Sequence, residues 1–166
     1  MKTLKIYILL FIATVTVAKA QFTKAELQVS GLTCSLCAKT TEKSLKALPF
    51  VGEIKTDLIR NVYVITFKND VPVDFDQISK KVKGSGFFVN YLKPTFNFSN
   101  TTLADNAFTY GGDTYKVLNA EKPLSGEVSL MIVDKGFLPN SVSKKYLGKA
   151  AETAAPASGK VYHLAI

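Results

Sequence analysis

Apolar and polar residues alternate along Phe22–Ser30, and the apolar positions Ala25, Leu27 and Val29 all fall on one side. This two-residue period is typical of a β-strand with one buried face. Residues 51–58 and 62–68 are rich in β-branched and aromatic residues, and Arg60-Asn61 lies between them. These two segments predict a β-hairpin. Residues 87–92 predict a further strand.

Two other segments carry apolar residues at helical spacing. The first, residues 38–48, directs Leu45 and Leu48 toward the core and ends before Pro49, which cannot continue a helix. The second segment begins at a capping aspartate, Asp74 or Asp76, and ends at the glycine-rich stretch 84–86. Its apolar residues at helical spacing are Phe75, Ile78 and Val82. The order βαββαβ therefore predicts an antiparallel four-stranded sheet with both helices on one face.

The pattern changes at Lys93-Pro94, where we place a boundary. Residues 107–110 and 114–118 flank a glycine turn and predict a hairpin, and residues 126–133 and 159–166 each predict an apolar strand. A short helix is expected near residues 141–149. The fold class is thus α+β: a βαββαβ sandwich over residues 21–93, then a small β-rich module over residues 94–166.

Both cysteines of the chain, Cys34 and Cys37, lie on the loop between the first strand and the first helix. A C-x-x-C pair can be a metal site, a redox dithiol or a small structural disulfide. A disulfide across so short a loop stabilises a fold little. Two thiolates on one loop can instead bind a soft metal ion, and a loop at a helix start favours thiolate. Thr33 and Ser35 are expected to shape this loop and to hydrogen-bond the sulfurs. One of the two is also expected to cap the helix.

The loop and its surroundings resemble the heavy-metal-associated domain family, whose hallmark is a Gly-Met-Thr-Cys-x-x-Cys loop. The resemblance covers about residues 22–89 and rests on a shared set of positions: Gly31, Thr33, Cys34, Cys37, Glu42, Leu45, Val51, Gly52 and the stretch 84–87. It implies a ferredoxin-like fold and metal binding by the two cysteines, with Cu(I), Zn(II), Cd(II) or Hg(II) as the family's ions. Leu32 stands where the family has methionine, a swap that conserves volume. By the same resemblance, Phe87 should lie under the metal loop.

The other possible ligands narrow the choice of metal. Beyond Cys34 and Cys37 the chain has His163 and, outside its first residue, Met131, and both lie in the second half. Closed structural zinc sites need four ligands, whereas two thiolates suit low-coordinate soft ions. We therefore expect Cu(I) capture or transfer to a metal-transporting or metal-accepting protein domain, with no catalysis. His163 as a third ligand is a remote alternative.

Two other functions remain open. The C-x-x-C pair could belong to a thiol–disulfide redox protein, although thioredoxin-like sites resemble Trp-Cys-Gly-Pro-Cys and this chain has no tryptophan. Alternatively, the protein is an interaction module in which residues 94–166 do the work and the cysteines are incidental.

Charge and the first residues bear on location. Residues 1–20 have the form of a secretory signal, with lysines, an apolar run and Ala18-Lys19-Ala20 before the expected cleavage point. We expect a secreted protein, with the periplasm as its compartment and no stable membrane insertion after cleavage. Removing the three lysines of this segment leaves +5 of the formal +8 charge. The remaining lysines are scattered, which is typical of solvated faces and indicates no nucleic-acid patch. The functional use that best fits this charge is docking to an acidic partner domain.

Overall fold

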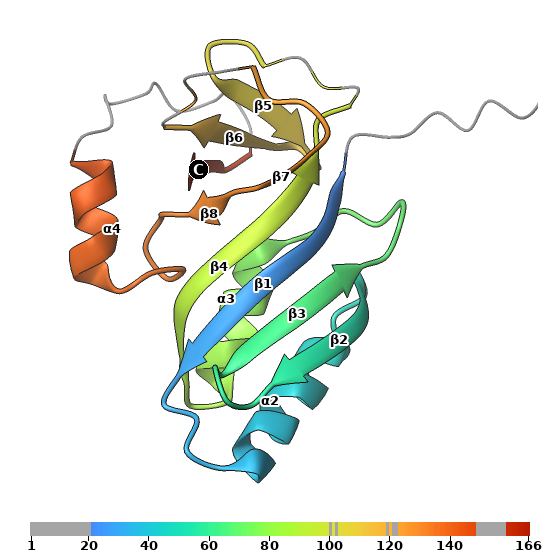
Figure 1. Cartoon of the computed structure of the whole chain (residues 1–166), viewed down its shortest axis with the longest axis vertical. Helices are drawn as coiled ribbons and strands as arrows, with labels where there is room; N and C mark the ends of the chain where they lie inside the picture. Colours follow the sequence, from blue (N-terminus) through green and yellow to red (C-terminus); the bar gives the residue numbers. More distant parts are fainter. Residues whose placement is uncertain (1–20, 100, 102, 119, 121–122, 149–158) are drawn as a thin grey trace, which may run out of the picture.

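The computed structural model describes residues 21–99, 101, 103–118, 120, 123–148 and 159–166 (Figure 1). The predicted signal at residues 1–20 lies outside this part of the chain. Within it, no helix is long and apolar enough to cross a membrane.

The first half of the described chain has the predicted βαββαβ order. Its elements are β1 (Phe22–Ser30), α2 (Ser35–Lys46), β2 (Val51–Asp57), β3 (Val62–Phe67), α3 (Phe75–Gly84) and β4 (Phe88–Asn97). The strands pair antiparallel in the spatial order β2-β3-β1-β4, and both helices cover one face (Figure 1). This arrangement is the ferredoxin-like sandwich that the sequence predicts.

The elements follow from the pattern of buried positions. In β1 the predicted inward residues Ala25, Leu27 and Val29 are fully buried or nearly so, and the residues between them are not. Burying these alternate side chains is the main favourable term in forming the sheet. Asp74 caps α3 by accepting a hydrogen bond from the N–H of Gln77 at 3.2 Å, as predicted for one of two aspartates.

The second half of the chain contributes most of its strands to another sheet. The elements of this half are β5 (Ala107–Tyr110), β6 (Asp113–Val117), β7 (Glu127–Ser129), β8 (Met131–Ile132), α4 (Asn140–Leu147) and β9 (Val161–Ala165). The second sheet has the order β5-β6-β9-β8, and β5 and β6 form the predicted hairpin.

The prediction of a single strand over residues 126–133 was wrong. The segment divides between the two sheets: β7 pairs with β4 in the first, and β8 pairs with β9 in the second. At the crossing, the N–H of Leu130 donates to the carbonyl of Pro94 at 2.8 Å, and the Leu130 side chain is fully buried. A continuous apolar run can form a strand in either sheet. The local pattern therefore does not show where the chain leaves the first sheet and enters the second.

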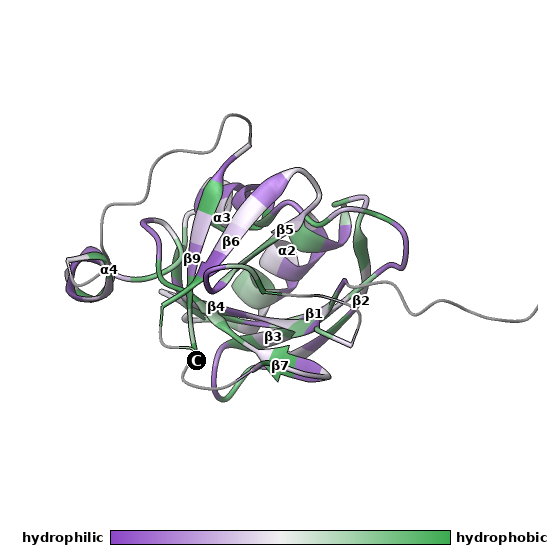
Figure 2. Cartoon of the chain, turned by 90° about the horizontal axis from the view of Figure 1, so that it is seen from above, coloured by the Kyte–Doolittle hydropathy of each residue, from purple (hydrophilic) through white to green (hydrophobic). Residues whose placement is uncertain are grey.

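The two halves share one hydrophobic core. The strand β4 runs through the predicted boundary at residues 93–94, and the second sheet lies on the same side of the first sheet as α2 and α3 (Figure 2). Aromatic rings from both halves meet there: Phe22, Phe75, Phe96, Phe108, Tyr115 and Tyr162. The core therefore joins the cysteine-bearing sandwich to the module behind it.

Candidate metal centre

The cysteine loop lies at one end of the sandwich, between β1 and the start of α2 (Figure 1). Cys34 is the N-cap of α2: its backbone is extended, and its Sγ accepts a hydrogen bond from the N–H of Cys37 at 3.1 Å. Neither Thr33 nor Ser35 caps the helix, so that expectation was wrong. Because the free N–H groups at a helix start carry partial positive charge, this position favours a thiolate on Cys34 once the sulfur is reduced.

In the structure Cys34 and Cys37 are joined by a disulfide, with their Cα atoms 5.3 Å apart. Cys34 is exposed and Cys37 is half-buried. Reduction would therefore leave two sulfurs close together at the surface. Two such soft donors fit a soft metal ion.

The base of the loop rests on the core, as the resemblance implied. Leu32, which stands at the family's methionine position, is half-buried and packs against the core cluster. Gly31 has a positive φ of 91°, and a Cβ atom there would lie 3.5 Å from the ring of Phe87. Phe87 is half-buried, packs against the core cluster and lies close to the start of the loop.

Two buried hydrogen bonds fix the first turn of α2 behind the sulfurs. The Tyr63 hydroxyl donates to the carbonyl of Ala38 at 3.0 Å, and the Thr41 hydroxyl donates to the carbonyl of Cys37 at 3.1 Å. Tyr63 and Thr41 are both fully buried, and burial raises the pKa of Tyr63, so its hydroxyl remains a donor at neutral pH. The bond from Tyr63 holds the sulfur-bearing turn against β3, and the bond from Thr41 ties that turn to the next turn of α2.

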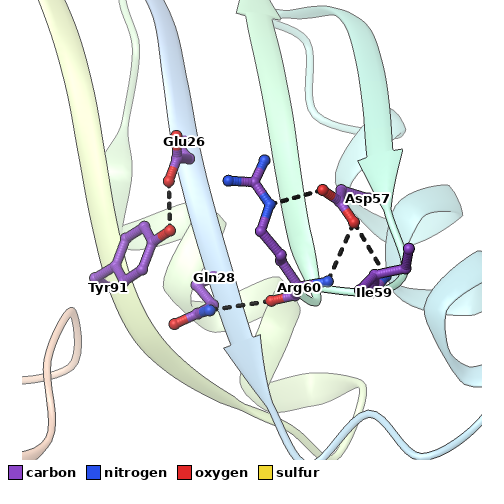
Figure 3. Close-up of polar contacts among 6 residues, drawn as sticks. All are labelled: Glu26, Gln28, Asp57, Ile59, Arg60 and Tyr91. Atoms are coloured by element: carbon purple, nitrogen blue, oxygen red, sulfur yellow. Dashed lines mark hydrogen bonds and ion pairs between the residues drawn. The ribbon is translucent and has the colours of Figure 1, made fainter.

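The turn between β2 and β3 lies against the end of β1, the strand that leads into the loop (Figure 3). Asp57 accepts hydrogen bonds from Arg60, which lower the pKa of its carboxyl, and the side chain of Gln28 donates to the carbonyl of Arg60 at 3.0 Å. The turn is thereby tied to the end of β1. It presents Ile59, whose side chain is 96% exposed.

An exposed apolar rim lies at the end of the sandwich that carries the cysteines. We use this name for Leu36, Ile59 and Phe88, which are 72%, 96% and 69% exposed. Leu36 lies between the two cysteines, and Phe88 pairs with Ser30 just before the loop. This rim was not predicted from the sequence, because the alternation of buried and exposed residues in the strands does not extend to it. The signal that could have found it is the presence of large apolar residues at the ends of elements, where side chains are expected to be exposed.

His163 is not part of this site. It lies on β9, where its Nδ1 is 2.8 Å from Asp134, and the same carboxylate accepts the backbone N–H of His163 at 2.6 Å. Among the residues that the structure describes, no three histidine, cysteine, aspartate or glutamate side chains come together as a metal site. The two cysteines are therefore the donors that the described loop brings together.

Comparison with known proteins agrees with this geometry. Residues 26–88 match the model of the heavy-metal-associated domain. This segment is a heavy-metal-associated domain. It contains the second half of β1, the cysteine loop, both helices of the sandwich, β2 and β3.

Curated relatives share only this part of the chain. Copper-transporting ATPase 2 of Rhizobium meliloti (strain 1021) is 30% identical over 69 residues, which are 42% of this chain and 8% of the ATPase. The probable copper-transporting ATPase HMA5 of Arabidopsis thaliana is 32% identical over 74 residues, which are 45% of this chain and 7% of the ATPase. The match thus spans less than a tenth of either relative.

Similar solved structures are a domain of a copper transporter and a domain of a zinc(II) ATPase. The yeast copper transporter domain Ccc2a, solved in apo and Cu(I)-loaded states, is 32% identical, with a TM-score of 0.36 over 39% of this chain and 88% of that domain. The amino-terminal domain of the zinc(II) ATPase ZiaA is 18% identical, with a TM-score of 0.38 over 65% of this chain and 94% of that domain.

Proposed function

We propose that this protein binds Cu(I) through the thiolates of Cys34 and Cys37 and hands the ion to an acceptor protein. The observation that carries the proposal is the pair of sulfurs on one surface loop at the start of α2. The similarity of this segment to copper-transporting ATPases supports copper as the cargo.

Metal binding requires the reduced loop. Two electrons and two protons, supplied by a dithiol reductant that becomes a disulfide, convert the Cys34–Cys37 disulfide into two thiols. Binding of one Cu(I) then releases the two thiol protons and leaves a bis-thiolate site with a net charge of −1. Hydrogen-bond donation from the N–H of Cys37 and the amino end of α2 favours this negative charge.

The site suits transfer because it is open. Cys34 is exposed, so a thiolate of an acceptor could approach the metal as a third ligand before the first two leave. Zn(II) and Cd(II) ordinarily take four ligands, and the described residues offer no third donor beside the cysteines. This donor set therefore favours Cu(I), with Hg(II) as a toxic substitute.

We further propose that the protein works outside the cytoplasm, on the strength of the signal-like residues 1–20. An oxidising compartment would return the loop to the disulfide unless metal arrives first. The disulfide in the structure is also the observation that favours a second candidate function, thiol–disulfide exchange by the same pair.

The test is competition for Cu(I) and Zn(II) between the reduced protein and a chromophoric chelator. We expect tight 1:1 Cu(I) binding, much weaker Zn(II) binding, and loss of both in Cys34→Ser/Cys37→Ser. Ser35→Ala keeps both sulfurs and is the control, with affinity expected to stay near that of the wild type. Cu(I) binding that is no tighter than in the double variant, together with rapid disulfide exchange with a model dithiol, would replace this proposal by the redox function.

A further inference from the structure

A groove of about 570 Å³ runs between the two halves of the chain and reaches Ser30, the last residue of β1 before the cysteine loop. Ser30, Lys83 and Phe88 line one side, and Lys135, Leu138 and Pro139 line the other. The first side belongs to the heavy-metal-associated domain. The second comes from the connection between β8 and α4, which the family match does not cover.

The groove is continuous with the metal loop. Ser30 immediately precedes Gly31, the first residue of the loop, and pairs with Phe88 across β1 and β4. A Cβ atom at Gly31 would lie 3.5 Å from the ring of the neighbouring Phe87. A protein that occupies the groove would therefore also contact the rim beside Cys34 and Cys37.

The second wall is held in place by contacts with α3 and the shared core. The Ser79 hydroxyl of α3 donates to the carbonyl of Gly136 at 2.8 Å. Phe137 is 2% exposed, and its ring centroid lies 6.0 Å from that of Tyr162. Because these contacts exist before any partner binds, docking would not require this wall to become ordered first.

The chemistry of the groove is cationic and apolar. Lys83 and Lys135 lie on opposite sides, no carboxylate is among the lining residues, and within the described chain neither ammonium group has an ion pair. Phe88 is 69% exposed, and Pro139 and the buried Leu138 also line the groove. Such a surface complements a segment that carries both carboxylates and apolar side chains.

We propose that this groove binds an extended acidic, partly apolar segment of the protein that exchanges metal with Cys34 and Cys37. The inference rests on the proposed function for the identity of the partner, and it gives the second half of the chain a recognition role. Carboxylates of the segment would pair with Lys83 and Lys135, and an apolar side chain would cover Phe88.

The probe is a short fluorescein-labelled peptide that alternates glutamate and leucine, titrated without metal and followed by anisotropy. We expect Lys83→Glu/Lys135→Glu to weaken binding about tenfold, since each reversed pair contributes on the order of 0.7 kcal/mol. Lys55→Glu/Lys68→Glu makes the same change in net charge outside the groove and should change affinity less than about twofold. Phe88→Ser should also weaken binding.

A second readout locates the peptide on the protein. In two-dimensional amide spectra, the signals of Val89 and Gly136 should shift on titration, and those of Lys55 and Lys68 should not. Equal weakening by both lysine pairs, or no binding at all, would overturn the proposal. Because the peptide is titrated without metal, Cys34→Ser/Cys37→Ser should bind it as the wild type does. If the reduced wild type failed to bind Cu(I) but still bound the peptide, the proposed function would be refuted and the groove assignment would stand.

Discussion

Replacing Tyr115 by alanine should destabilise both halves of the protein together. Tyr115 belongs to β6 in the second half and is fully buried. Its ring stacks between those of Phe108 and Tyr162, with centroids 5.2 Å away in each case. It also lies 5.1 Å from Phe22 and 6.2 Å from Phe75, which belong to the first half.

The expected loss follows from the cavity that the substitution leaves. Truncating a buried aromatic residue to alanine typically costs about 3–5 kcal/mol, because burial is lost and the space refills only in part. The rings around Tyr115 come from several elements and are held by one another, so the site cannot collapse easily. A domain is ordinarily stable by about 5–15 kcal/mol, and the variant should therefore be close to unfolding under mild conditions.

The assay is urea unfolding followed by the amide signals of Leu27 in the first half and Leu164 in the second. A shared core predicts that Tyr115→Ala lowers the unfolding midpoints of both signals equally. Phe88→Ala removes an aromatic ring that is 69% exposed and should change stability by less than about 0.5 kcal/mol. A lower midpoint for Leu164 with an unchanged midpoint for Leu27 would show that the halves unfold independently and would refute this reasoning.

Three further substitutions test local parts of the account. Tyr63→Phe removes the hydrogen bond to the Ala38 carbonyl. It should lower the free energy of unfolding in urea by about 1 kcal/mol and weaken Cu(I) affinity. An unchanged free energy of unfolding and an unchanged affinity would show that this bond does not support the loop. Tyr162→Phe removes a buried hydroxyl that has no hydrogen-bond partner in the described chain, so stability should stay the same or rise by up to about 1 kcal/mol; a large loss would reveal a missing partner. The hydrogen bond from Lys46 lowers the pKa of Glu42 below that of an ordinary glutamate. The contribution of this carboxylate to stability is therefore present above the ordinary pKa and is lost as the pH falls through the lowered one. Thermal midpoints of Glu42→Gln should therefore fall less on acidification than those of the wild type, and parallel curves would contradict this.

The sandwich could be predicted from the sequence because its signals are local. The alternation in β1, the helical spacing around Leu45 and the cap at Asp74 each depend on residues close together in the chain, and each element confirmed the expectation. The pair Cys34 and Cys37 was also evident, because both cysteines lie on one loop.

The features that could not be predicted depend on contacts between distant residues. The change of sheet within residues 126–133 depends on the pairing of Leu130 with Pro94, 36 positions earlier in the chain. The common core depends on rings such as Phe22 and Tyr115 meeting across the two halves. The cap by Cys34 was missed for a different reason: caps are expected from hydroxyl, carboxyl and amide oxygens, and here a sulfur takes their place.

The central claim is that the sulfurs of Cys34 and Cys37 bind the metal, and copper K-edge X-ray absorption of the reduced, Cu(I)-loaded protein tests it most directly. The account predicts copper bound by sulfur in the wild type and loss of that sulfur signal in Cys34→Ser/Cys37→Ser. Copper bound only by nitrogen or oxygen in the wild type, or a sulfur signal that persists in the double variant, would contradict it.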